Sequence, residues 1–394
     1  MDANCSNSPV LAIGGESINQ TPVPDAALHL AIDLRITDAP GGERSGLGRY
    51  AVELARELPR ARPGWELTIF SSRPELRGPS SPAPRTTRWP TRSSAGRVSW
   101  LHLGSALEAR PRPDVWFTPA VAFPIWWRGP TVAAVHDLVP VLMPERYRGR
   151  LNAAHAGWAL RRAARRADRV LCGSSATRDL LVERLGADPA RLRVTPYGVA
   201  APFLTAERGG AGAGDDFLLF VGTLEARKGL EVLHEALSAA NRAGAGLRLL
   251  AVGAPGWRTG ELVSRLRADP AVEVVEDASD EEVARLYSTA RALVYPSRME
   301  GFGLPVAEAI AVGCPVIASD LPPIREFAGE VPRYVPAGDA AALTAAIEEV
   351  ATNPRHAEER AARGRGQVAG LRWARVAEAV AAEIEAAVGE APSR

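Results

Sequence analysis

The sequence predicts an α/β protein made of two doubly wound domains that face each other across a cleft. Its 394 residues exceed what one hydrophobic core usually organises, since domains average about 150 residues. Short apolar, β-branched strands alternate with helical stretches, a pattern typical of parallel sheets covered by helices on both faces. A glycine-rich segment, residues 204–214, predicts a linker between an amino-terminal domain, 28–203, and a carboxy-terminal domain, 215–370.

Composition excludes several classes of protein. Hydrophobic residues make up 46% and charged residues 24%, which excludes a fibrous, coiled-coil or mostly disordered chain, and no apolar run is long enough to span a membrane. Residues 1–200 carry 27 Lys and Arg against 18 Asp and Glu, whereas residues 201–394 carry 20 against 28. This asymmetry predicts two domains with different partners. No basic run is interleaved with aromatic residues, so nucleic acid is not expected as a partner.

The cysteines and the amino terminus bear on the cellular compartment. Cys5, Cys172 and Cys314 are scattered, which argues against a disulfide framework or a structural zinc site. Residues 1–27 predict a flexible tail without the pattern of a secretory signal. We therefore expect a cytoplasmic protein, and peripheral contact with the inner face of an anionic membrane stays open.

The amino-terminal half begins with a strand at 29–34, a glycine loop, and a helix at 49–58 whose apolar stripe is Tyr50, Leu54 and Leu58. A long loop is expected at 71–97. The further strands are expected at 66–70, 115–118, 131–136, 169–172 and 194–199, and the further helices at 149–167 and 175–185.

The carboxy-terminal half alternates more regularly. Strands are expected at 217–221, 248–252, 272–275, 292–295 and 315–318, and helices at 228–242, 259–268, 280–289, 305–312, 322–328, 339–352 and 355–369, with a last amphipathic helix at 371–390. Ligands of such sheets bind beyond the carboxyl ends of the strands, so the loops that follow the strands are the place to look for chemistry.

The first of these loops combines a tight turn with two cations. A strand ends at Val221, Gly222 permits the turn, and Arg227 and Lys228 stand at the start of a helix. The amides at a helix start favour an anion. An Arg guanidinium can donate two parallel hydrogen bonds to phosphate oxygens, and Lys adds a point charge. The alternative is a solvated pair of cations, which the helix dipole makes mildly unfavourable. The loop therefore predicts phosphate binding.

The second loop, 297–308, places glycines on both sides of Phe302 and a proline at the first helical position. The backbone amides of Phe302, Gly303 and Leu304 are expected to face the cleft. Glu300 lies before the helix and Glu308 one turn inside it, so they would contact different parts of one ligand. Carboxylates beside free amides suit a sugar nucleotide. The alternative makes Glu308 a favourable first-turn charge and Glu300 an ordinary loop residue.

With both motifs in place, residues 217–320 resemble the donor half of a retaining family 4 glycosyltransferase, a family with the GT-B fold of two Rossmann-like domains. The match rests on VGTLEARKGL and VYPSRMEGFGLPVAEAIAVGCPVIASD, within which EGFGLPVAE fits the Glu-x7-Glu signature. The resemblance implies that Glu300 approaches the donor-sugar hydroxyls and Glu308 holds the ribose. It also implies that Arg227 and Lys228 neutralise the diphosphate leaving group, with no divalent metal or other cofactor.

The amino-terminal half resembles the same family in two places. Gly46 and Gly48, in GLGRY, resemble the glycine loop near the diphosphate and the acceptor; the alternative is an ordinary strand-to-helix turn. His136, followed by Asp137, resembles the His-Asp of the cleft wall, which implies a catalytic place for His136; the alternative is a satisfied structural histidine. The family's last helix often crosses back to the first domain, which we expect of residues 371–390.

Other residues bear on the donor. Residues 253–257 (GAPGW) and the GTLE run, which contains Thr223 next to Gly222, resemble members that use GDP-mannose. Glu276 and Asp277 are expected near the nucleotide base. GDP-mannose is therefore the favoured donor of a hexosyl transfer that retains the anomeric configuration.

The acceptor is left open by the sequence. An aromatic cluster and an arginine-rich helix stand in the amino-terminal half, namely Trp116, Phe117, Phe123, Trp126, Trp127, Arg161, Arg162, Arg165, Arg166 and Arg169. They fit a membrane surface with a lipid-linked acceptor, a pocket for a carbohydrate or natural product, or core aromatics beside a solvated face. Two further functions compete with transfer: a nucleotide-sugar epimerase or hydrolase of the same fold, and a non-catalytic nucleotide-binding subunit.

Overall fold

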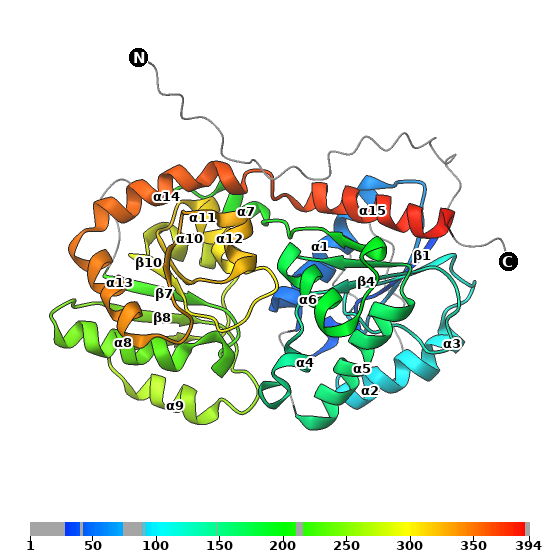
Figure 1. The fold of residues 1–394 in the computed structure, drawn as a ribbon, viewed down its shortest axis with the longest axis horizontal. Coiled ribbons are helices and arrows are strands. Elements are labelled where there is room, and N and C mark those ends of the chain that lie inside the picture. Colours follow the sequence, from blue (N-terminus) through cyan, green and yellow to red (C-terminus); the bar gives the residue numbers. More distant parts are fainter. Residues whose placement is uncertain are drawn as a thin grey trace, which may run out of the picture.

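The structure is a computed structural model that describes residues 28–39, 42–73, 89, 91–147, 149–209 and 216–390. Two α/β domains lie side by side, each centred on a six-stranded parallel sheet (Figure 1). The strand orders are β2-β1-β3-β4-β5-β6 and β12-β11-β10-β7-β8-β9. The expected class of two doubly wound domains is confirmed. The predicted tail, 1–27, lies outside the described residues.

The amino-terminal sheet contains β1 (His29–Asp33), β2 (Glu66–Phe70), β3 (Val115–Thr118), β4 (Thr131–Val135), β5 (Arg169–Cys172) and β6 (Leu192–Val194). Its helices are α1 (Gly46–Ala61), α2 (Ser94–Ser99), α3 (Ser105–Glu108), α4 (Val139–Leu142), α5 (Arg150–Arg166) and α6 (Ser175–Leu185), and a π-helical turn, Trp100–Gly104, joins α2 to α3.

The carboxy-terminal sheet contains β7 (Phe217–Val221), β8 (Arg248–Val252), β9 (Val272–Val275), β10 (Ala292–Tyr295), β11 (Val316–Ser319) and β12 (Arg333–Val335). Its helices are α7 (Ala201–Thr205), α8 (Leu230–Arg242), α9 (Gly260–Ala268), α10 (Asp280–Thr289), α11 (Leu304–Val312), α12 (Pro322–Ala328), α13 (Ala340–Thr352) and α14 (Pro354–Val368), followed by α15 (Trp373–Gly389).

Central strands are buried on both faces, as their continuous apolar sequences predict; every residue of β4 and β10 is buried. The stripe of Tyr50, Leu54 and Leu58 on α1 is likewise buried, and Ser45 caps this helix by accepting a hydrogen bond from the Gly48 amide. The strands thus fix two rigid sheets whose carboxyl ends carry the loops of interest.

The chain crosses between the domains at two adjacent places. Helix α15 packs against α1 and strands β3 to β5, so it lies on the amino-terminal domain, whereas α14 lies on the other (Figure 1). Helix α7 packs against α10 and α11, and Val199 forms a bridge with Arg372. The first crossing is therefore at residues 199–200, and the predicted boundary at 203 is too late. Residues 204–205 of the predicted linker belong to α7, and 210–214 lie outside the described residues.

Several other expectations need correction. The segment expected as a loop, 71–97, ends in helix α2, and the strand expected at 194–199 is β6, which begins two residues earlier and ends at Val194. The aromatic cluster is mostly core, because Trp116, Phe117, Phe123 and Trp127 are buried. Two of the arginines are also engaged: Arg169 pairs with Glu383 and Glu390 of the α15 region, and Arg162 donates to the Phe123 and Pro124 carbonyls.

Within the described ranges, no helix has the length and apolar character needed to cross a bilayer.

Candidate functional site

A cavity of about 750 Å³ lies between the two domains at the carboxyl ends of their strands. Asp33 at the end of β1, His136 after β4, Val221 at the end of β7 and Tyr295 at the end of β10 all line it. This is the place where doubly wound sheets bind ligands, because the loops that follow the strands converge there.

Lys228 and Glu300 form a buried ion pair in this cavity. The Lys228 Nζ lies 2.6 Å from Glu300 Oε1 and 2.8 Å from the Tyr295 hydroxyl. The hydroxyls of Tyr295 and Ser297 also donate to Glu300 Oε1, at 2.8 and 2.5 Å. Burial opposes ionisation of Glu300, but Lys228 and Arg227 outweigh it and hold the pKa of this carboxyl below its ordinary value. The two sequence motifs therefore meet as a charged, pre-oriented cluster.

Arg227 lies beside this pair with unused hydrogen-bonding capacity. Its Nε donates to Glu225 Oε2 at 2.9 Å, but its Nη1 is buried and has no hydrogen-bond partner among the described residues. Burial lowers the pKa of Arg227, but Glu300, Asp137 and Glu225 raise it, and the net pKa is above the ordinary value. A permanently charged donor without an acceptor is costly in a buried site, which indicates that an anion belongs there.

The start of α11 adds backbone donors to the same cavity. Gly303 precedes the helix with φ of 105°, a conformation that favours glycine, and no side chain caps the helix. Pro305 has no N–H and the Val306 amide donates to the Gly303 carbonyl, so the donors left for an anion are the amides of Gly303 and Leu304 at the helix start. Phe302, Gly303 and Leu304 line the cavity together with Arg227 and Lys228, and the Arg298 amide joins the two loops by donating to the Arg227 carbonyl at 2.9 Å.

Glu308 is engaged from the opposite domain. It is 2% exposed and accepts a hydrogen bond from Arg49 Nη1, while Arg49 Nη2 lies 2.5 Å from Asp280 Oδ1. The Tyr287 hydroxyl lies 3.4 Å from Glu308 Oε2. Arg49 thus connects α1 to α10 and α11. Its position after the glycine loop was visible in the sequence, but nothing in the sequence showed that it reaches across the cleft.

The titration of Glu308 gives a testable pH dependence. Burial raises the pKa of this carboxyl to about 7, Arg49 acts in the opposite direction, and Asp280 adds to the rise. Since the folded-state pKa lies above the ordinary value of 4.5, the protonated group stabilises the fold at low pH, and this contribution is lost as the pH rises from 4.5 through about 7. We expect Glu308→Gln to show a melting temperature that falls less than that of the unmodified chain between about pH 5 and about pH 7.5.

The matched control for this measurement is Glu261→Gln, on an exposed carboxylate of α9. It should reproduce the pH profile of the unmodified chain. Identical melting profiles for Glu308→Gln and the unmodified chain would contradict the raised pKa.

His136 lines the cavity, but both of its ring nitrogens are occupied. Nε2 lies 2.5 Å from the Pro119 carbonyl, which can only accept, so Nε2 carries the proton and Nδ1 accepts from the Tyr197 hydroxyl. Burial lowers the pKa of His136, which keeps the ring neutral. The geometry therefore fits the structural alternative for this ring better than proton transfer in catalysis.

The remaining predicted residues divide into two groups. Gly46, Gly222 and Thr223 line the cavity. Gly48 does not, because it packs on its own loop: a Cβ there would lie 1.8 Å from the Gly42 carbonyl oxygen. The turn alone therefore requires a glycine at this position, and a ligand role for Gly48 stays a prediction.

Glu276 and Asp277 also lie outside the cavity lining. They follow β9, the edge strand of the sheet, and are exposed, with Glu276 paired to Arg267. Their expected place near the nucleotide base therefore stays a prediction.

Comparison with known proteins adds the family context. Residues 44–201 match the family described as Glycosyltransferase Family 4, and residues 215–353 match the family Glycosyl transferases group 1. The serotype-specific mannosyltransferase WbdA of Escherichia coli is 29% identical over 236 residues, which cover 55% of this chain and 29% of WbdA. A D-inositol 3-phosphate glycosyltransferase of Kineococcus radiotolerans is 27% identical over 405 residues, 86% of this chain and 90% of the relative.

Among solved structures, sucrose-phosphate synthase from Thermosynechococcus elongatus superposes with a TM-score of 0.71 at 22% identity, covering 92% of this chain and 100% of that one. The chain spans less than half of the length of WbdA. Both halves of the chain therefore carry glycosyltransferase family domains, and together they form the GT-B fold.

Proposed function

We propose that this protein is a retaining glycosyltransferase that moves a hexosyl group from a nucleotide-diphosphate sugar to an acceptor hydroxyl. The observation that carries the proposal is the buried Arg227 Nη1, which has no acceptor in the described residues and lies in the same cavity as Lys228 and the uncapped start of α11. A diphosphate supplies the anionic oxygens that this arrangement lacks.

Departure of a nucleoside diphosphate places negative charge on phosphate oxygens while the anomeric carbon becomes cationic. Arg227 and Lys228 are held in position before the reaction, so they stabilise the added negative charge of the transition state more than the smaller charge of the bound donor. Glu300 is ionised and oriented by Tyr295 and Ser297, which fits hydrogen bonding to donor-sugar hydroxyls. The donor phosphate itself would take the acceptor proton, so attack on the same face needs neither a protein base nor a divalent metal.

The favoured donor is GDP-mannose. The name of WbdA describes a mannosyltransferase, and residues 253–257 resemble members that use GDP-mannose. Pro255 and Trp257 of this segment line the cavity beside Gly222 and Thr223. Glu308 is the candidate to hold the ribose, in which case the nucleotide would displace Arg49 from it.

The two alternative functions gain no support. An epimerase or hydrolase needs an acid–base group in the cleft, and the histidine predicted from the sequence for the cleft wall, His136, has both ring nitrogens engaged. A binding-only subunit would not need Lys228, Glu300 and Arg227 in a transition-state arrangement.

The proposal is tested with a panel of nucleotides and a turnover assay. GDP, UDP, ADP and TDP are added separately while thermal unfolding is followed, and GDP is expected to raise the melting temperature most, because a ligand of the folded state stabilises by RT ln(1+[L]/Kd). GDP release from GDP-mannose in the presence of an acceptor should continue in EDTA. If none of the four nucleotides raises the melting temperature, or if EDTA abolishes turnover, the donor site or its metal independence is wrong.

A further inference from the structure

The two sides of the cavity differ in chemistry. The carboxy-terminal side presents Arg227, Lys228 and Glu300, whereas the amino-terminal side combines polar residues with a stretch of aliphatic ones. We use the name apolar wall for five lining residues of the amino-terminal domain: Val98, Leu101, Val121, Ala122 and Leu160. Since the donor groups lie on the opposite side, an acceptor that binds on the amino-terminal side can lie along this wall.

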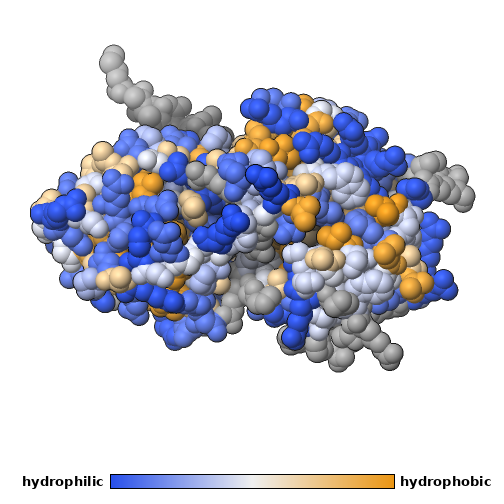
Figure 2. All heavy atoms as spheres, turned by 90° about the horizontal axis from the view of Figure 1, so that it is seen from below, coloured by the Kyte–Doolittle hydropathy of each residue, from blue (hydrophilic) through white to orange (hydrophobic). Residues whose placement is uncertain are grey.

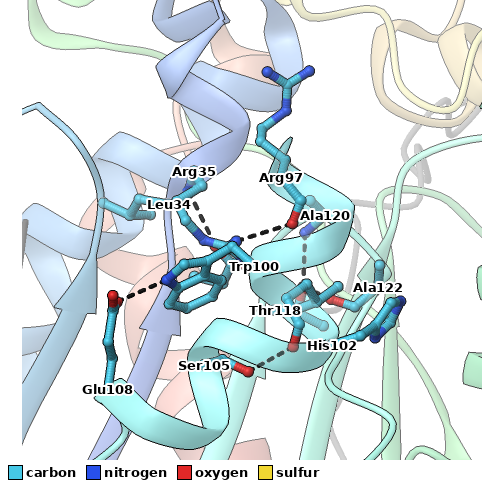
Figure 3. Close-up of polar contacts among 12 residues, drawn as sticks. Leu34, Arg35, Arg97, Trp100, His102, Ser105, Glu108, Thr118, Ala120 and Ala122 are labelled. Carbon is cyan, nitrogen blue, oxygen red and sulfur yellow. Dashed lines mark hydrogen bonds and ion pairs between the residues drawn. The ribbon is translucent and has the colours of Figure 1, made fainter. Parts of the chain in front are cut away.

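The buried Arg35 beside the apolar wall is neutralised within the protein. Arg35 is 2% exposed; its Nε lies 2.8 Å from Asp33 Oδ1, and its Nη2 bonds the other oxygen of the same carboxylate. Its guanidinium stacks on the Trp100 ring, 3.2 Å from the centroid (Figure 3). Burial lowers the pKa of His155, so this lining residue is neutral near pH 7. An acceptor would therefore meet a paired Arg35 and a neutral His155 here, with Arg97, which donates to backbone carbonyls, at the edge of the wall.

Two residues of the apolar wall lie on segments with irregular backbone conformations. Leu101 lies on the π-helical turn Trp100–Gly104, and Val121 has φ of 61°, a left-handed conformation that is strained for a β-branched residue. Single π-helical turns and strained residues raise the free energy of the folded backbone, so they persist only where the surrounding structure holds them. Both are frequent at binding sites. These two features come from different segments and place aliphatic side chains on the same cavity.

A hydrogen-bond network fixes both segments (Figure 3). Arg35 Nη1 donates to the Arg97 carbonyl at 3.1 Å, and Trp100 Nε1 donates to Glu108 Oε2 at 2.7 Å. The Thr118 hydroxyl donates to the Ala122 carbonyl at 2.9 Å, which holds the turn that contains Val121. The apolar wall is therefore pre-organised, which reduces the entropy lost on binding.

The two segments that carry Leu101 and Leu160 also expose apolar side chains at the outer surface. Leu103 and Leu107 follow Leu101 on the same segment and are 62% and 69% exposed, and Leu151 and Trp158 of α5 are 88% and 41% exposed. In the view of Figure 2, apolar side chains are more frequent over the amino-terminal domain, on the right, than over the other domain. Exposed apolar side chains of this kind, outside the cavity lining, suit contact with an apolar surface such as a bilayer.

We propose that the apolar wall is the acceptor subsite, and that the acceptor is an amphiphile whose hydroxyl-bearing end reaches the donor while an apolar chain or skeleton lies along Val98, Leu101 and Val121. This inference rests on the proposed transferase function. A dissolved amphiphile and a lipid in a bilayer present the same chemistry to the wall, and the experiment separates them.

The test compares two acceptors that differ only in their apolar part, methyl and octyl α-D-mannopyranoside, with GDP-mannose as donor and the octyl compound below its micelle concentration. The unmodified protein is expected to show a kcat/KM at least about tenfold higher for the octyl compound, since buried methylenes favour binding. Equal values, or a preference for the methyl compound, overturn the inference. Stabilisation by GDP is measured in parallel, so that loss of the donor site is recognised separately.

Matched variants locate the effect. Val121→Thr and Val98→Thr keep side-chain volume but bury a hydroxyl against the alkyl chain, and each should reduce the octyl-to-methyl preference by about fivefold or more. Leu103→Ser, on an outward-facing residue of the same segment, should leave the preference for the dissolved compounds unchanged. If both threonine variants retain the full preference while GDP still stabilises them, the apolar wall is not the acceptor subsite.

The source of the amphiphile is distinguished with hexadecyl α-D-mannopyranoside in vesicles of phosphatidylcholine and phosphatidylglycerol. A lower rate of Leu103→Ser on these vesicles, but not on the dissolved octyl compound, assigns the acceptor to a membrane. Turnover that is confined to the dissolved compound assigns it to a soluble amphiphile.

Discussion

Arg227→Ala is expected to lower kcat by about 10²- to 10³-fold while leaving the fold intact. Among the described residues, the side chain donates a hydrogen bond to Glu225, and its buried Nη1 has no acceptor there. Its removal therefore deletes a donor that the transition state would use, at little cost to the folded state. Steady-state kinetics with GDP-mannose and thermal unfolding together measure the two effects.

Two further variants make this result interpretable. Arg227→Lys should recover only part of the loss, because an ammonium group cannot make two parallel hydrogen bonds to a diphosphate. Arg265→Ala removes an exposed arginine of the same domain, whose Nη2 lies 3.5 Å from Glu231, and it should leave kcat unchanged. A normal kcat for Arg227→Ala would remove this residue from the diphosphate site.

Much of the fold was predictable because local pattern and tertiary environment agree. The strands β7 to β10 have the bounds expected from the sequence, since continuous apolar, β-branched runs are buried on both faces of a parallel sheet. The π-helical turn Trp100–Gly104 was not predictable, because it depends on packing of Trp100 against Arg35, far from it in sequence. The crossing at residues 199–200 was missed because glycine content marks a loop but does not show which domain the flanking helix contacts.

The candidate site likewise contains residues that the sequence predicted and contacts that it did not predict. Arg227, Lys228, Glu300 and the start of α11 were found from residues that follow strands, and the structure places them in one cavity. The engagement of Glu308 by Arg49 and the occupied ring of His136 depend on contacts between the two domains. No pattern within one segment contains that information, so these contacts required the structure.

The approach of the two domains can be tested at Gly301, where the chain passes against the opposite domain. A Cβ on Gly301 would lie 1.4 Å from the His136 carbonyl oxygen, so Gly301→Ala must separate the two backbones. Because the acceptor side and the donor side belong to different domains, a displacement of about 1 Å is expected to lower kcat by about 10²-fold. GDP should still stabilise the protein, since Arg227, Lys228 and Glu300 all lie in the carboxy-terminal domain.

The control is Gly366→Ala in α14, where a Cβ would meet nothing within 4 Å. This substitution should raise the free energy of unfolding by about 0.5–1 kcal/mol without changing kcat. An unchanged kcat for Gly301→Ala would mean that turnover does not require this contact between the domains.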